Sequence, residues 1–284
     1  MTETHTTSAN LSTAQKILAI AILSLVAGLV FIGLVNFYPV GVDWKASYYT
    51  PLHGHFLDPY EHSNFEGLPL LLLMVPHALL SLKVGNAINL MVHFAVLATL
   101  IWVKKGGWQA LVLTFTSPLF LDLVRTNNVD WVPALAFLLP PMWGLPLLAA
   151  KPQTVGGAAL IWRKREKFSP KMLLPLIGLV VLSLVIWGFW PTEVGLSDVR
   201  NQAWNFAPWP LGIPLGIYLL YKGYQLNDEV VAAAATPLLV PYFAPYSLVP
   251  LMALLSCKYP KMAFYIYCTF WFYFVIEARR IAAT

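Results

Sequence analysis

Residues 35–69 bring several kinds of chemically active side chain into one short segment between two apolar stretches. The segment, VNFYPVGVDWKASYYTPLHGHFLDPYEHSNFEGLP, holds four acids, three histidines and four tyrosines. Asp43 is the acid nearest to the end of the preceding apolar stretch. A carboxylate can take the proton from an attacking hydroxyl group, and a positioned base contributes about 10²–10⁴ in rate. Asp43 is therefore a candidate general base, and a solvated loop acid or a helix N-cap is the alternative explanation.

Three basic residues stand beside other apolar stretches of the chain. They are Arg125 in VRTNNVDW, Lys151 in LLAAKPQT and Arg200 in LSDVRNQAW. Cations at membrane depth are costly and therefore need a reason to be there. One reason is the binding of a phosphate group, and the other is snorkelling of a long side chain to lipid phosphates.

A polar turn follows Arg125 and contains Asn127, Asn128 and Asp130. These side chains could hold substrate hydroxyls or a divalent cation, because oxygen ligands suit hard cations. A capping turn explains them equally well, since Asn and Asp favour such positions.

The histidines of the first segment raise the question of a metal site. His53, His55 and His62 lie close in sequence to Asp58 and Glu61, but they do not have an HExxH-like spacing. We therefore expect a polar loop or a substrate contact here. A zinc site is conceivable here as the alternative. The sequence predicts no certain cofactor, and a divalent cation is a possible one.

The composition shows what kind of structure must position these residues. The chain is 58% hydrophobic and 11% charged, with a mean hydropathy of +0.67. About a quarter of the residues of a soluble domain are charged, so this chain could not cover a soluble surface. We predict a polytopic membrane protein that contacts lipids. The net charge of +5 does not indicate nucleic acid, because the basic residues cluster beside apolar segments.

The apolar stretches predict an all-α protein with about nine to eleven transmembrane or re-entrant helices. Residues 1–14 form a polar tail, and 15–284 form a single membrane domain. The run 17–37 is too long for a signal-peptide core, so we expect a retained first span. Several stretches are shorter than the roughly 20 residues of a straight crossing. The stretches are 15–37, 68–82, 86–103, 108–124, 129–146, 147–162, 172–190, 208–222, 229–245, 246–257 and 262–278.

Orientation follows from lysine and arginine, which favour the cytoplasmic side. We place three basic sites there: Lys104 with Lys105, the run Arg163 to Lys171, and Lys258 with Lys261. This arrangement works if the short stretch 68–82 is interfacial or re-entrant and stays outside. The first outer loop then extends from about residue 38 to 85, and most acids fall on the outer face.

Taken in order, these motifs resemble the GT-C class of membrane glycosyltransferases, most closely the polyprenyl-phosphate-mannose-dependent α-mannosyltransferases. The likeness runs from about residue 40 to 257. It rests on the polar turn 126–130, on the Lys151–Pro152 step and on the first loop, with Asp43, Tyr48 or Tyr49, Leu52, Gly54, Pro59 and Tyr60. Two motifs depart from the family pattern. FEGLP replaces a YPP motif, and the late turn VPYFAPYSL lacks the expected His and Asp.

The resemblance implies a GT-C-like bundle in the cell (cytoplasmic) membrane. Its active face would lie on the extracytoplasmic side. It implies transfer of a hexose, with mannose the first candidate, from a polyprenyl-phosphate donor to a lipid or glycan acceptor by inverting displacement. Asp43 would be the base. The substrate-binding residues would be Tyr48, Tyr49, His55, Tyr60, Arg125, Asn127, Asn128, Asp130, Lys151, Arg200 and Tyr242.

Two other functions stay open at this point. A non-catalytic GT-C-like subunit or scaffold of a membrane complex fits the short chain and its altered motifs. A transporter would place ionisable residues along a path through the membrane. The predicted span interiors hold almost no acids, which argues against a transporter.

Overall fold

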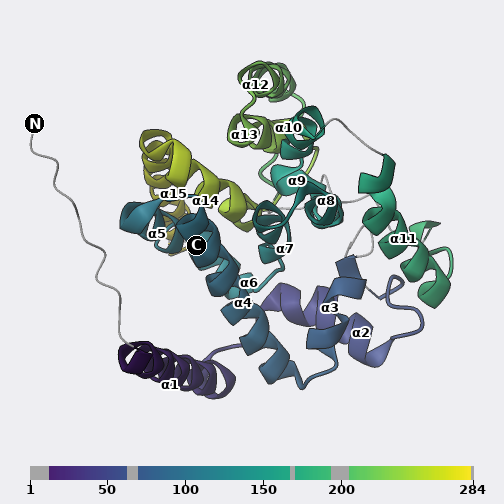
Figure 1. Ribbon diagram of the computed structural model, residues 1–284, viewed down its shortest axis with the longest axis vertical. Coiled ribbons are helices and arrows are strands. Elements are labelled where there is room, and N and C mark those ends of the chain that lie inside the picture. The colour runs from purple at the N-terminus through teal and green to yellow at the C-terminus, as the bar shows by residue number, and fades with distance from the viewer. Residues whose placement is uncertain (1–12, 63–69, 167–169, 193–204, 283–284) are drawn as a thin grey trace, which may run out of the picture. The chain divides into compact units, whose positions relative to one another are not determined.

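The computed structural model describes residues 13–62, 70–166, 170–192 and 205–282. Over these ranges the chain is all-α, with fifteen α-helices and no strand, which confirms the predicted class (Figure 1). The sequence predicts one domain from residue 15, and the structure divides into two compact units, residues 1–39 and 40–284. The two units are described separately.

The first unit contains one long helix, α1 (Thr13–Phe37). It has 25 residues and, after the polar first turn TAQK, is almost entirely apolar. The helix therefore covers the run that the sequence predicts as a first span.

The second unit begins with a π-helix and a short α-helix, η1 (Trp44–Tyr49) and α2 (Thr50–Gly54). The remaining elements follow in chain order: α3 (Leu70–Ala78), α4 (Leu82–Val103), α5 (Gly107–Phe115), α6 (Pro118–Thr126), α7 (Trp131–Leu135), η2 (Ala136–Leu138), α8 (Pro141–Ala150), α9 (Pro152–Val155), α10 (Ala158–Arg165), η3 (Pro170–Leu173), α11 (Leu174–Trp187), η4 (Trp190–Thr192), α12 (Ile213–Leu226), α13 (Glu229–Leu239), η6 (Pro245–Leu248), α14 (Val249–Lys258) and α15 (Pro260–Ala282).

Two helical stretches of the described chain are long and apolar enough to cross a membrane. They are α4, with 22 residues, and Pro170–Trp187, with 18 residues, which joins η3 to α11. A third candidate is the pair α5 and α6, which is bent by 56° at a break between the two helices. The helix α3 has nine residues, or about 14 Å, and so cannot cross alone. Its length fits the interfacial or re-entrant segment predicted for 68–82.

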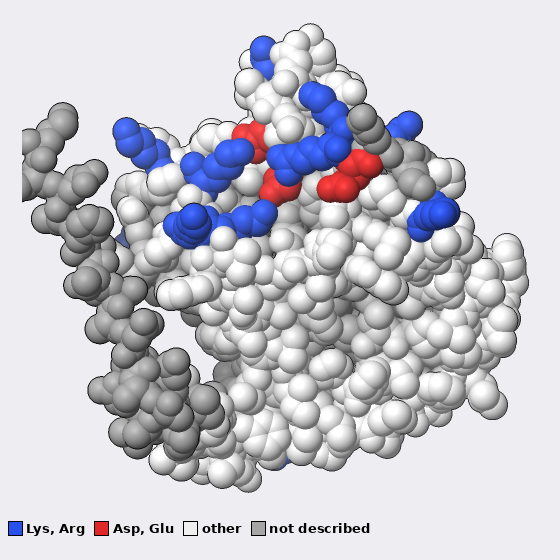
Figure 2. All heavy atoms as spheres, viewed as in Figure 1, with Lys and Arg blue, Asp and Glu red and all other residues white. Residues whose placement is uncertain are grey.

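The helix α11 exposes a broad apolar surface. Val185 is 76% exposed, and Leu174, Ile177, Val181 and Leu182 are also exposed. In the view of Figure 2, a large area below the charged residues shows neither acidic nor basic side chains. Apolar surface of this kind suits contact with lipid chains.

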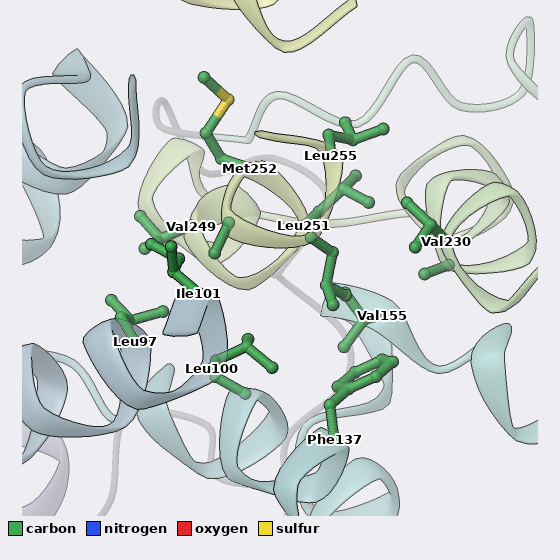
Figure 3. Close-up of a cluster of buried hydrophobic side chains, with 14 of the residues drawn as sticks. Leu97, Leu100, Ile101, Phe137, Val155, Val230, Val249, Leu251, Met252 and Leu255 are labelled. Carbon is green, nitrogen blue, oxygen red and sulfur yellow. The ribbon is translucent and has the colours of Figure 1, made fainter. Parts of the chain in front are cut away.

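The main core of the second unit lies where α4 meets α14. Leu97, Leu100 and Ile101 of α4 pack with Val249 and Leu251 of α14 (Figure 3). The apolar repeat of α4 supplies this contact, because residues three and four apart share one helix face. Replacing a fully buried leucine such as Leu100 by alanine costs about 2–5 kcal/mol in a close-packed core.

The three basic sites predicted to share one side do lie together. Lys104 and Arg165 both contact the carboxylate of Glu229, at 2.7 and 2.9 Å. The neighbouring Asp228 pairs with Lys258 at 2.8 Å and caps α13. Figure 2 shows the charged side chains of this face gathered in one band at the top of the view.

Asp228 is held in its ionised form. Burial alone would raise its pKa, but hydrogen bonds from Lys258, Tyr259 and two backbone N–H groups outweigh burial. The pKa of Asp228 is therefore lowered. Asp228 caps α13. Through Lys258 and Tyr259 it also connects α13 to the junction between α14 and α15 on the basic side.

Candidate functional site

A cavity of about 560 Å³ in the second unit collects several of the predicted site residues. The cavity is lined by η1 and the residues just before it, by the end of α6 and the turn after it, by the start of α9 and by residues 242–247. Its polar lining includes Asp43, Tyr48, Arg125, Lys151 and Tyr242. Together with Asn128, six residues predicted as one site from separate motifs therefore share one cavity.

Asn128 connects the lining residues from the centre of the site. Its Nδ2 donates to Asp43 Oδ2 at 2.8 Å and to the Tyr246 hydroxyl at 3.2 Å. Its Oδ1 accepts from the Tyr48 hydroxyl at 2.9 Å and from Lys151 Nζ at 2.6 Å. One side-chain amide thus fixes a carboxylate, two phenols and an ammonium group relative to each other.

Lys151 is a buried cation with a buried counter-ion. The residue is 5% exposed, and its Nζ lies 2.8 Å from Oδ1 of Asp130, which is 1% exposed. The other carboxylate oxygen, Oδ2, accepts no hydrogen bond from the part of the chain that the structure describes. Burial raises the pKa of Asp130, and the charge of Lys151 opposes this effect only in part.

The backbone explains why Lys151 points into the site. It stands between α8 and α9 with φ −142° and ψ 67°, outside the helical region. Proline disfavours the α conformation of the residue before it, so Pro152 ends α8 at this point. The side chain then lies 5.4 Å from the centre of the Tyr246 ring, within the range of a cation–π contact.

Arg125 is the second cation of the cavity and is far more exposed. Its Nη2 and Nε contact Asp122 Oδ1 at 2.7 and 3.1 Å, and its side chain is 68% exposed. The cavity lining thus contains two cations, Arg125 and Lys151, and two carboxylates, Asp43 and Asp122.

A second amide cluster supports the site from behind. Asn127 ends α6 in the left-handed conformation, with φ 50°. Its Nδ2 donates to the backbone carbonyl of Asn86 at 2.8 Å, and its Oδ1 accepts from Asn89 at 2.9 Å. Asn86 also accepts a hydrogen bond from the backbone N–H of Gly41, at 2.9 Å. A Cβ at Gly41 would come within 2.4 Å of Asn127 Cβ, so only glycine permits this approach. Asn127 therefore positions the loop before Asp43 and does not line the cavity.

The π-helix η1 sets the direction of the residues after Asp43. Trp44 and Tyr48 are both fully buried, and Trp44 donates its indole N–H to the backbone of Leu82 at 3.3 Å. Single π-helical turns occur often at functional sites, because they shift side chains out of the ordinary helical register. Tyr48 consequently reaches the cavity on the same side as Asp43.

The other predicted residues lie elsewhere in the second unit. Tyr49 stacks on His53, with ring centres 4.8 Å apart. Tyr60 stacks on Trp190 at 4.6 Å. His55 faces another part of the first loop, and none of these three lines the cavity. Arg200 falls outside the described residues.

Several lining residues were not predicted as part of the site. Tyr246 is not among the predicted site residues, but its hydroxyl accepts a hydrogen bond from Asn128 Nδ2 at the centre of the network. Burial raises its pKa, and the Asp43 carboxylate raises it further, so the phenol stays protonated. Asp122 is the other acid of the cavity. The pair Asn86 and Asn89 could have been found from sequence, because amides three apart in an apolar helix share a face.

The chemistry available to this cavity is proton removal beside fixed positive charge. Asp43 can accept a proton, and Lys151 and Arg125 can stabilise an anion that develops nearby. No protein-family model, no curated protein and no solved structure matches the chain. The function must therefore be argued from the geometry of the site.

Proposed function

We propose that this chain is a membrane glycosyltransferase that transfers a hexose from a polyprenyl-phosphate donor. Mannose is the first candidate for that hexose. The observation that carries the proposal is that Asp43, Lys151 and Arg125 line the same cavity. A lipid-linked sugar presents its phosphate at the membrane surface, and its transfer needs one base and nearby cations. The cavity supplies both kinds of group within one hydrogen-bonded network.

Asp43 takes the hydroxyl proton of a lipid or glycan acceptor. The acceptor oxygen forms a new bond to the anomeric carbon as the bond from that carbon to the phosphate oxygen breaks. The electron pair of the broken bond leaves with the polyprenyl phosphate, and the anomeric centre inverts. The developing negative charge on the phosphate is what a cation must stabilise in the transition state.

The two cations of the cavity have different parts in this reaction. Lys151 is buried and held by Asp130 and Asn128, so it forms a fixed positive group. Arg125 is exposed, and its bond to Asp122 can be exchanged for a phosphate. Guanidinium groups bind phosphate oxygens in a bidentate manner, which fits the recognition of a donor headgroup at the rim.

The membrane arrangement that goes with this function is a multi-pass protein of the cell membrane, with the cavity facing outside. Two or three candidate spans and the clustering of the basic sites on one side support it. The basic side faces the cytoplasm in this arrangement. The shorter helices then enter the membrane as re-entrant or paired segments in a GT-C-like bundle.

Transfer of labelled mannose by the purified protein in lipid tests the proposal. The comparison is wild type against Asp43→Asn, with Glu61→Gln as the control, because Glu61 is an exposed acid outside the cavity. We expect transfer by wild type and the control and a loss of transfer in Asp43→Asn. If wild type transfers nothing across several donors and acceptors, the catalytic proposal fails. A stable co-purifying membrane protein would then support a non-catalytic subunit.

A further inference from the structure

The connection between α2 and α3 brings together three side chains of the kinds that bind metal ions. His55, Asp58 and His62 each offer one ligand atom, and these atoms all lie within 4.8 Å of one another. His62 Nε2 is 3.5 Å from Asp58 Oδ2, and the rings of His55 and His62 stack with their centres 3.6 Å apart. His53, the third histidine of the segment, is not part of this group.

The backbone around these residues is anchored by aromatic contacts. The indole N–H of Trp187 donates to the backbone carbonyl of Phe56 at 2.8 Å. Tyr60 is buried against Trp190, with ring centres 4.6 Å apart. The part of the loop between His55 and His62 is therefore held against the end of α11 and against η4. Asp58 and His62 remain exposed, so an ion can reach them from solvent.

We propose that His55, Asp58 and His62 form a binding site for a divalent transition-metal ion, with zinc as the best-matched case. Two imidazoles and one carboxylate are an established zinc ligand set, and a water molecule completes the tetrahedron. Zinc bonds to nitrogen and oxygen are about 2.0–2.2 Å, so ligand atoms around zinc stand about 3.3–3.5 Å apart. The His62–Asp58 pair is already at 3.5 Å. Rotation of the half-buried His55 side chain closes the remaining distance.

The expected role of the ion is to cross-link the two ends of the loop from His55 to His62. It joins a residue at the end of α2 to one seven positions later, across a segment that is otherwise held by aromatic contacts. None of the three ligands lines the cavity around Asp43. The metal site is therefore independent of the proposed transferase chemistry, and either proposal can fail without the other.

The first experiment measures zinc binding by the full chain, purified without a histidine tag and stripped with a chelator. Zinc is titrated against a chromophoric competitor in detergent solution. The variants are His55→Gln and His62→Gln, and His53→Gln is the matched control, with the same substitution in the same segment. We expect one zinc ion per chain for wild type and the control. Each ligand variant should bind about 100-fold more weakly or worse, since even changes to outer-shell partners cost about 10–100-fold.

X-ray absorption of the zinc-loaded protein identifies the ligands directly. Two imidazoles and light oxygen scatterers at about 2.0–2.1 Å are expected, and loss of the imidazole signal is expected in the double variant of His55 and His62. Zinc should also raise the unfolding temperature of wild type but not of that variant. The proposal is overturned by substoichiometric binding, or by equal affinity in wild type and both ligand variants.

Discussion

The buried pair formed by Lys151 and Asp130 gives the sharpest prediction about the site. Replacing Lys151 by methionine keeps most of the side-chain volume but removes the charge. Asp130 is then left 1% exposed with no other cation paired to it among the described residues, and the oxygen of Asn128 loses a donor at 2.6 Å. Breaking a buried ion pair by removing one partner costs about 3–5 kcal/mol, because the remaining charge is uncompensated.

The loss should be visible as a lower unfolding temperature in detergent solution. For chains of this size class, 1 kcal/mol corresponds to about 2–4 °C, so Lys151→Met should lower the midpoint by about 6–20 °C. The matched double variant, Lys151→Met with Asp130→Asn, should recover most of the loss. The pair of Arg125 and Asp122 serves as the reference, because its arginine side chain is 68% exposed, so Arg125→Gln should cost less than Lys151→Met.

The deficit of Lys151→Met should also depend on pH. Without the lysine, burial raises the folded pKa of Asp130 further above the unfolded value of about 3.9. A carboxyl group whose folded pKa is raised favours folding below its unfolded pKa and loses that contribution as the pH rises. The deficit should therefore be larger at pH 8 than at pH 5. Equal stability of wild type and Lys151→Met, or a double variant no better than the single one, would refute this reasoning.

Two further predictions test the supports of the site, and a third tests the role of Asp228 on the basic side. Asn128→Leu should destabilise the protein by about 1–3 kcal/mol, because it leaves buried donors unpaired, and unfolding in detergent measures this. Gly41→Ala should cost about 1–3 kcal/mol in the same assay, because its Cβ would stand 2.4 Å from Asn127 Cβ. Wild-type stability should fall as the pH drops below about 4, because Asp228, whose pKa is lowered when folded, takes up a proton and loses its pairing with Lys258. Asp228→Asn should flatten that part of the pH profile, and an unchanged profile would contradict the assignment.

Much of the local structure could be predicted from sequence because it depends on neighbouring residues. The apolar runs became helices, and the run 68–82 became a helix too short to cross a membrane. The step at Lys151 and the turn at Asn127 and Asn128 follow from local backbone preferences of Pro and Asn. Those preferences placed the residues at helix ends, where side chains can converge on a site.

The contacts between distant segments could not be predicted in the same way. The bond between Asn128 and Tyr246 joins residues 118 positions apart, and no periodicity in the sequence fixes such a partner. The grouping of His55 with His62 depends on how the loop bends around Tyr60. For the same reason Tyr49, Tyr60 and His55, assigned by motif to the substrate site, lie outside the cavity.

The central claim is that Asp43 takes the proton of the acceptor hydroxyl while the sugar donor is bound in the cavity. A single-turnover experiment tests it most directly, with labelled polyprenyl-phosphate-mannose first bound to wild type or to Asp43→Asn and acceptor then added. We predict that both proteins retain the donor and that the variant transfers the sugar about 10²–10⁴ times more slowly. Equal transfer rates in the two proteins, or no retention of the donor by wild type, would contradict the claim.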